Sequence, residues 1–174
     1  MYKRQAEGIR RHLEPQQLSV GVSGGCESIV IGLKLKVEEA TLKRLRRVLV
    51  YLDVKNAHNS YKRRKDLQAL RELVAKDPSL RTLLRAFEAT SSQPNPIFVR
   101  SSTTSNGLKF LCNSSAGGAQ GNPLTNIIFP VAINNTLKST EAEHPGVETR
   151  AQQDDINLWG DPDMIFGPGK ALEK

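Results

Sequence analysis

The feature that most constrains the fold is a short apolar run between two helical patterns. Residues 47–53, RVLVYLD, are rich in Val and Leu and end on a carboxylate. A run of this length and composition is typical of a buried β-strand. Apolar residues recur at helical spacing before it, at 26–47, and after it, at 62–76. The sequence therefore predicts an α+β domain in which Asp53 stands at the end of a strand.

Two further helices are expected. One follows Pro78, and the other covers 122–138, with Pro123 in its first turn and a kink at Pro130. The apolar stripes predicted to enter the core are Ile29, Leu33, Val37, Leu42, Leu45, Leu67, Leu70, Leu73, Val74, Leu80, Leu83, Leu84, Phe87, Leu124, Ile127, Ile128 and Val131.

Two hairpins complete the predicted elements. IFVR (97–100) and LKFLC (108–112) flank a polar turn that ends in Asn-Gly, a pair common in hairpin turns. VETRAQ (147–152) and INLWG (156–160) are expected to pair around a tight turn, which places adjacent acids at a hairpin tip. The tail from 161 to 174, with three Pro or Gly positions in FGPGK, is predicted to be loose.

The charge is unevenly distributed along the chain. Residues 1–90 carry 19 Lys and Arg against 10 Asp and Glu, whereas residues 91–174 carry 6 against 8. A basic half joined to a slightly acidic half fits a protein that attracts phosphates over one surface. Solvated helix faces give the same pattern, so nucleic-acid binding and a plain charged surface are both open at this point.

Membrane spans, disulfides and zinc sites are not indicated. No stretch approaches the roughly 20 apolar residues that a membrane span needs, and the first residues are charged. Cys26 and Cys112 have no CxxC or Cys/His cluster near them and are expected to be reduced and buried. We expect an intracellular protein, in the nucleus or the cytoplasm.

Three carboxylates could act together. Asp53 ends one predicted strand, and Asp154 and Asp155 stand at a hairpin tip 101 positions later. Carboxylates from neighbouring strand ends can hold two Mg²⁺ ions about 3.5 to 4 Å apart, an arrangement used in phosphoryl transfer. Adjacent acids in a turn are also commonly just solvated, and spacing alone does not separate the two readings.

A resemblance to a known family begins at these residues. YLDVKNAHNSYKRR (51–64) resembles motif A of reverse transcriptases of non-LTR retrotransposons, matching at Asp53, Asn56, Ala57, Asn59 and Arg63. GGAQGNPLTNIIFPVAIN (117–134) resembles motif B, and QQDDINLWG (152–160) resembles motif C. LEPQQLSVGVSGGCESIVIGLK (13–34) is similar to the segment before motif A. The three motifs occur in the family's order and at its separations, over nearly all of residues 13–160.

The resemblance implies a polymerase palm, an antiparallel sheet with packed helices, with fingers and thumb incomplete. Residues 1–160 would be a partial reverse transcriptase domain. The implied reaction is RNA-directed DNA synthesis: Asp53 and Asp154 hold two Mg²⁺ ions, or Mn²⁺, Asp155 supports them, and a primer 3′-hydroxyl attacks a deoxynucleoside triphosphate. Implied partners are an RNA template and a DNA primer. The implied nucleotide and template contacts are His58, Gln120, Gly121 and Asn122.

Several positions depart from the family pattern, so enzyme activity stays open. His58 replaces an aromatic residue that packs under the incoming sugar, and Asn122 replaces an acid. Gln152 and Gln153 stand where the family has an aromatic and a small residue, and Pro130 interrupts the motif B helix. The alternative is a degenerate fragment that binds nucleic acid without catalysis. A further alternative is an RNA-directed RNA polymerase, which shares the palm and the paired aspartates. The Gln-Gly-Asn-Pro-Leu and Asn-Ala-His-Asn segments of this chain, however, resemble reverse transcriptases instead.

Overall fold

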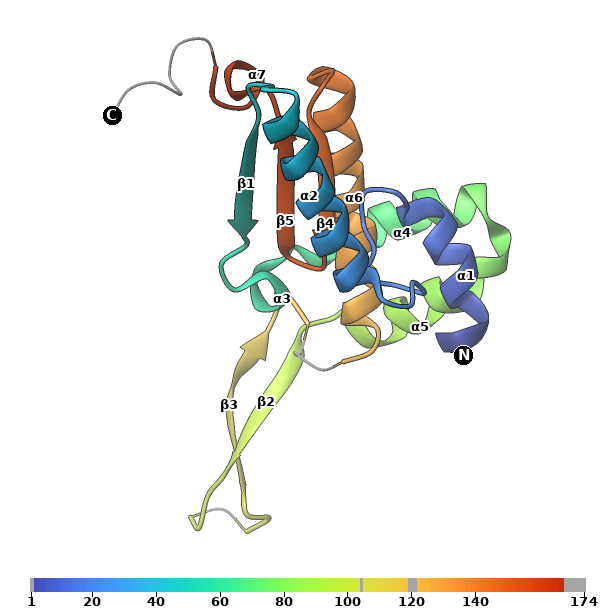
Figure 1. Ribbon diagram of the computed structural model, residues 1–174. Helices are drawn as coiled ribbons and strands as arrows, with labels where there is room; N and C mark the ends of the chain where they lie inside the picture. The colour runs from blue at the N-terminus through green and yellow to red at the C-terminus, as the bar shows by residue number, and fades with distance from the viewer. Residues whose placement is uncertain (1, 104, 119–121, 168–174) are drawn as a thin grey trace.

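The computed structural model describes residues 2–103, 105–118 and 122–167. A three-stranded sheet stands beside a lobe of helices, and a long hairpin projects away from both (Figure 1). The helices are α1 Tyr2–Leu13, α2 Gly25–Leu42, α3 Ala57–Ser60, α4 Arg63–Lys76, the 3-10 helix η1 Pro78–Leu80, α5 Arg81–Ser91, α6 Thr125–Glu143 and α7 Pro162–Phe166. The strands are β1 Val48–Asp53, β2 Asn95–Arg100, β3 Leu108–Ser114, β4 Glu148–Gln152 and β5 Asp155–Gly160.

The three-stranded sheet is antiparallel, in the order β1-β5-β4. Helix α6 packs on one face, where Leu137 meets Ala151 and Ile156 in an apolar cluster. Helix α2 lies against β4 on the opposite face, where Lys36 reaches Glu148. The expected hairpin of 147–152 and 156–160 is confirmed, and its turn lies at the same end of the sheet as the end of β1 (Figure 1).

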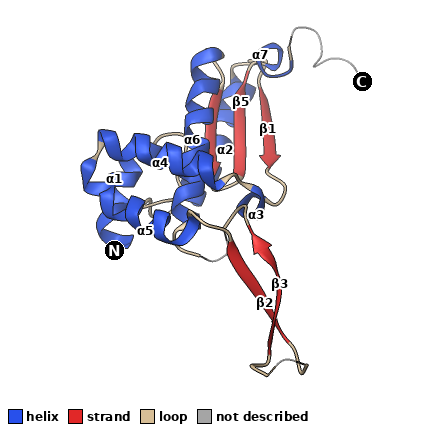
Figure 2. Ribbon diagram, turned by 180° about the vertical axis from the view of Figure 1, so that it is seen from behind, coloured by secondary structure: helices blue, strands red, loops and turns tan. Residues whose placement is uncertain are grey.

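The main core lies between the helices, in the lobe beside the sheet (Figure 2). The predicted stripes of α4, η1, α5 and α6 are confirmed as parts of this cluster. Helix α1, which the sequence pattern did not predict, adds Ile9 and Leu13, both fully buried. Pro130 is buried inside α6, and the helix continues past it. The chain is thus mixed α and β, with small antiparallel sheets.

Strands β2 and β3 form the predicted second hairpin, which extends well beyond the body of the molecule (Figure 2). Phe98 and Phe110 pack edge to face across it, with ring centroids 6.0 Å apart. A register irregularity falls between Ile97 and Phe98.

Four expectations about burial and the tail were wrong. Strand β1 is an edge strand with most residues exposed, because neither α2 nor α6 extends over it. In the first stripe, Ile29 is buried but Val37, Leu42 and Leu45 are exposed, because α2 contacts the sheet mainly along β4. Cys26 and Cys112 are both exposed, on α2 and on the projecting hairpin. Residues 162–166 of the predicted loose tail form α7, which Asp161 caps by accepting a hydrogen bond from the Asp163 amide.

Over the part of the chain that the structure describes, no helix is both long enough and apolar enough to cross a bilayer.

Candidate metal centre at the end of the sheet

Asp53 and Asp155 are directly opposite each other across neighbouring strands. Asp53 is the last residue of β1 and Asp155 is the first of β5, and the two are Cα partners in the antiparallel register. Directly opposed side chains leave the same face of a sheet, with Cβ atoms about 5 Å apart. Both side chains are exposed, so a cation could reach them from solvent.

Asp154 stands beside this pair. It is the second residue of the two-residue turn that joins β4 to β5, and it is partly buried. The hydroxyl of Tyr51, which lies two residues before Asp53, donates a hydrogen bond to Oδ1 of Asp155. That bond, followed by some desolvation and the charges of all three aspartates, raises the pKa of Tyr51 to about 12. The negative charges of Asp53, Asp154 and Asp155 therefore all act on the hydroxyl of Tyr51.

The turn that carries Asp154 has an unusual backbone. Gln153, its first residue, has φ 62, in the left-handed region where such turns usually carry Gly or Asn. The side chain of Gln17 holds this residue on both sides, because its Oε1 accepts from the Gln153 amide at 3.0 Å and its Nε2 donates to the Gln153 carbonyl at 2.9 Å. The Gln153 side chain donates in turn to the Asn126 carbonyl at 3.1 Å.

The remaining predicted contacts lie around α3 and the start of α6. His58 packs its ring on Phe129 of α6, with centroids 5.5 Å apart, and its buried Nδ1 has no hydrogen-bond partner among the described residues. Asn122 accepts from the Leu124 amide at 2.9 Å, in the turn that precedes α6. The predicted template contacts Gln120 and Gly121 lie outside the described residues.

Arg63 ties the aspartate segment to the glycine loop. Its guanidinium is buried and donates to the carbonyls of Gly117, Gln93 and Ala116 and to the hydroxyl of Ser114, at 2.6 to 3.4 Å. The backbone amides of Gly117 and Gly118 donate to the carbonyls of Tyr61 and His58 at 2.8 and 2.7 Å. The loop before Gln120 is thus fastened through its backbone to α3 and the residue after it, and through the Arg63 side chain to α4.

Glycine is required in this loop. Gly117 has φ +60, and a Cβ there would lie 2.3 Å from the Asn59 carbonyl carbon. A Cβ on Gly118 would lie 2.1 Å from the hydroxyl oxygen of Thr125. The close approach of the loop to α3 and α6 explains why glycine occupies both Gly117 and Gly118.

A cavity of about 340 Å³ opens beside this loop. Its lining includes the buried side chains of Arg63 and Thr125, together with Asn122, Gly117 and Gly118. The cavity is therefore lined both by the segment 51–64 and by the segment 117–134, which meet here in space.

Asp66, one turn after Arg63 on α4, is a buried acid whose pKa is raised well above its ordinary value. Its side chain is 3% exposed, and Oδ2 has no hydrogen-bond partner in the described part of the chain. Burial raises its pKa to about 7. The sequence signalled neither this burial nor the four bonds of Arg63, because both acid and base sit in a charged stretch that reads as solvated.

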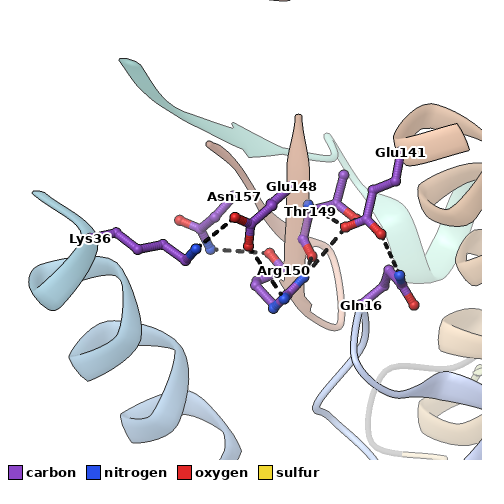
Figure 3. A network of polar contacts seen from close by, with 7 residues as sticks. All are labelled: Gln16, Lys36, Glu141, Glu148, Thr149, Arg150 and Asn157. Carbon is purple, nitrogen blue, oxygen red and sulfur yellow. Dashed lines mark hydrogen bonds and ion pairs between the residues drawn. The ribbon is translucent and has the colours of Figure 1, made fainter. Parts of the chain in front are cut away.

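A network of polar side chains holds the sheet to its flanking helices (Figure 3). Glu141 of α6 accepts from the amide and hydroxyl of Thr149 and from Nε2 of Gln16, and it pairs with Arg150. Glu148 pairs with Lys36 of α2 at 2.6 Å and with Arg150 at 3.5 Å. Hydrogen bonds from the Thr149 groups and Gln16, with the charge of Arg150, lower the pKa of Glu141 although burial opposes them. This network fixes β4 between α2 and α6.

The aspartates suit a hard divalent cation by ligand chemistry. Within residues 2–103, 105–118 and 122–167, no group of three or more His, Cys, Asp or Glu is arranged so that it could hold a metal by itself. Mg²⁺ usually takes one or two protein carboxylates and fills its other positions with water and substrate phosphates. Asp53 and Asp155, exposed and opposite each other, provide two carboxylates of that kind.

Comparisons with known proteins add no relative: no family model, no curated protein and no solved structure matches the chain.

Proposed function

We propose that this chain is the palm core of a reverse transcriptase of the non-LTR retrotransposon type, an RNA-directed DNA polymerase. It would add deoxynucleotides to the 3′-hydroxyl of a DNA primer on an RNA template. The observation that carries the proposal is the register of β1 and β5, which sets Asp53 opposite Asp155, with Asp154 in the adjoining turn.

The protein's own groups would act by position and charge. Asp53 and Asp154 are proposed as the principal ligands of two Mg²⁺ ions, for which Mn²⁺ can substitute, and Asp155 as the supporting acid. When bound, such ions would activate the attacking hydroxyl and stabilise the leaving phosphate oxygen. Tyr51, by its hydrogen bond, would hold the Asp155 carboxylate in one orientation.

His58 and Asn122 would border the nucleotide. His58 presents an imidazole against Phe129, and Asn122 lines the cavity that Arg63 and the glycine loop enclose. Gln120 and Gly121, which follow that loop, are proposed to approach the template base or the incoming nucleotide. A small residue at Gly121 would let nucleic acid come close to the backbone.

The basic half of the chain supports contact with nucleic acid. Lys62, Arg64 and Lys65, at the start of α4 and directly after α3, are exposed and have no ion-pair partner among the described residues. These exposed cations could bind template or primer phosphates in a sequence-independent and salt-sensitive way.

A second candidate is a degenerate fragment that binds nucleic acid without catalysis. The bulky Gln152 and Gln153 beside Asp154 favour it, since a displacement of about 1 Å at a catalytic group can cost two orders of magnitude in rate. Under this reading the free cations keep their role and the aspartates lose theirs.

Primer extension separates the two functions. The purified chain is incubated with an RNA template annealed to a labelled DNA primer, Mg²⁺ or Mn²⁺ and deoxynucleoside triphosphates. Glu148→Gln is the matched control, because Glu148 is an acid of the same sheet that pairs with Lys36 and Arg150. Incorporation by the wild type and by Glu148→Gln, abolished in Asp154→Asn, supports the polymerase. Salt-sensitive template binding with no incorporation by the wild type supports the fragment that only binds.

A further inference from the structure

Gln17 holds the turn of Asp154 from a buried position. Its side chain is 0% exposed, and its amide bonds both backbone polar groups of Gln153, a residue 136 positions later. One side chain therefore satisfies the N–H and the C=O of the residue that immediately precedes Asp154. A buried amide with both ends paired has one orientation, because rotating it would set donor against donor.

The residue that Gln17 holds needs such support. Gln153 has φ 62, a left-handed conformation that is unfavourable for a residue with a Cβ and that glycine adopts freely. The conformation persists only where surrounding contacts determine it. The two bonds from Gln17 are such contacts, and the direction in which Asp154 leaves the turn depends on them.

The support is itself rigid. The Leu18 amide donates to the Ala151 carbonyl at 2.9 Å, and the Ala151 amide donates to the Gln16 carbonyl at 2.7 Å, so the Gln17 backbone runs beside β4 as a short parallel bridge. The start of α2 closes over it: a Cβ on Gly25 would lie 2.2 Å from the Leu18 carbonyl oxygen. Gln17 is thus fixed between the strand and the helix.

We propose that Gln17 is a positioning residue for the candidate metal centre. Its buried amide holds Gln153 in the left-handed conformation and thereby sets Asp154 beside Asp53 and Asp155. This inference rests on the proposed function for its chemical consequence. The clamp, by which we mean the two hydrogen bonds from the Gln17 side chain to the Gln153 backbone, exists without metal and can be measured in the metal-free protein.

The test uses Gln17→Met, which keeps an unbranched side chain of similar size and removes both hydrogen bonds. Gln16→Met is the matched control. Gln16 is a neighbouring buried glutamine whose side chain donates to Glu141 and not to the turn (Figure 3). Backbone hydrogen exchange and Mn²⁺ affinity, the latter by electron paramagnetic resonance, are measured on the full chain, with thermal unfolding to confirm that each variant is folded.

In Gln17→Met we expect the Gln153 amide to exchange roughly tenfold faster, since a hydrogen bond of about 1.4 kcal/mol is lost. We expect Mn²⁺ affinity to fall roughly tenfold, the usual effect of losing a group that orients metal ligands. Gln16→Met should change neither. Gln153→Gly provides a rescue, because glycine needs no clamp at φ 62: in that background Gln17→Met should reduce Mn²⁺ affinity by less than about threefold.

Each result bears on one claim. An unchanged Gln153 exchange rate in Gln17→Met, or an equal change in Gln16→Met, overturns the clamp. Faster exchange with unchanged Mn²⁺ affinity overturns the positioning role and leaves the proposed function intact. A wild type that binds no Mn²⁺ overturns the metal centre and with it the role of Gln17 there. If Gln17→Met does not fold, the Gln153→Gly background decides. A folded double variant that binds Mn²⁺ like Gln153→Gly supports the proposal, and a folded double variant that binds Mn²⁺ roughly tenfold more weakly than Gln153→Gly overturns it.

Discussion

The guanidinium of Arg63 is anchored on the carbonyl of Gly117, with Nε and the carbonyl oxygen 2.6 Å apart and both inside the protein. Arg63 belongs to the segment that begins at Asp53, and Gly117 opens the segment that resembles motif B. One buried side chain therefore joins the two halves of the candidate site, and Gln93 and Ser114 at the base of the projecting hairpin share it.

Arg63→Lys should lower the free energy of unfolding by about 2 to 3 kcal/mol, because an ammonium cannot reach the acceptors that the planar fork bonds and leaves buried carbonyls unpaired. Urea denaturation measures it. Arg64→Lys, at the exposed neighbouring position, should change the free energy of unfolding by less than about 0.5 kcal/mol. Equal effects in the two variants would contradict the structural role given to Arg63.

Gly117→Ala should be more destabilising than Gly146→Ala by about 2 kcal/mol or more. Both residues have positive φ, so backbone strain is common to the two substitutions. Only at Gly117 does the new Cβ meet backbone, at 2.3 Å from the Asn59 carbonyl carbon, whereas nothing lies within 4 Å at Gly146. Chemical denaturation of the two variants compares them, and similar losses would mean that the glycine loop does not lie against α3.

Asp66 makes stability depend on pH. Its folded pKa of about 7 lies above the unfolded value near 3.8, so its protonated form favours the folded state below pH 4, and that advantage is lost as pH rises through 7. Between pH 5 and 8 the wild type should lose about 2 kcal/mol of stability that Asp66→Asn does not lose. Urea melts at both pH values measure this. Parallel pH curves for the two proteins would show that Asp66 does not titrate in this range.

Asp155→Asn should lower the pKa of Tyr51 from about 12 toward its ordinary 10, since the hydrogen bond to the Asp155 carboxylate is the largest cause of the increase and the charge of Asp155 adds to it. The ¹³Cζ signal of Tyr51, followed by NMR up to pH 11, reports the change. Tyr51 should be largely neutral at pH 11 in the wild type and largely ionised in the variant. A Tyr51 signal that titrates alike in both would place the phenol away from the carboxylates.

The sequence was a good guide wherever one local pattern decided the structure. The hairpin around Gln153 and Asp154 follows from strand alternation and turn length, and the core stripes of α4 and α6 follow from helical period. The order of the strands in the sheet, β1-β5-β4, could not be predicted from such local patterns. The pairing of Asp53 with Asp155 joins strands about one hundred residues apart, and only the resemblance to a family suggested that they meet.

The residues that support the site were missed because their partners are distant in the chain. In the sequence, Gln17 is one of two adjacent glutamines, and nothing local distinguishes it from Gln16. In the structure, Gln17 bonds the turn that carries Asp154, whereas Gln16 bonds Glu141. Burial of β1 was overestimated for a related reason, since an apolar run does not reveal whether a helix covers it. Here α2 lies along β4 instead and leaves Tyr51 exposed.

The central claim, that Asp53 and the aspartates of the distant β4–β5 hairpin bind divalent cations together, is tested most directly by Mn²⁺ binding. The unbound Mn²⁺ signal is followed by electron paramagnetic resonance while wild type, Asp53→Asn, Asp155→Asn and Glu148→Gln are titrated. We predict a site in the wild type and in Glu148→Gln whose affinity falls roughly tenfold or more in each aspartate variant. Equal affinities in wild type and Asp53→Asn would contradict the claim.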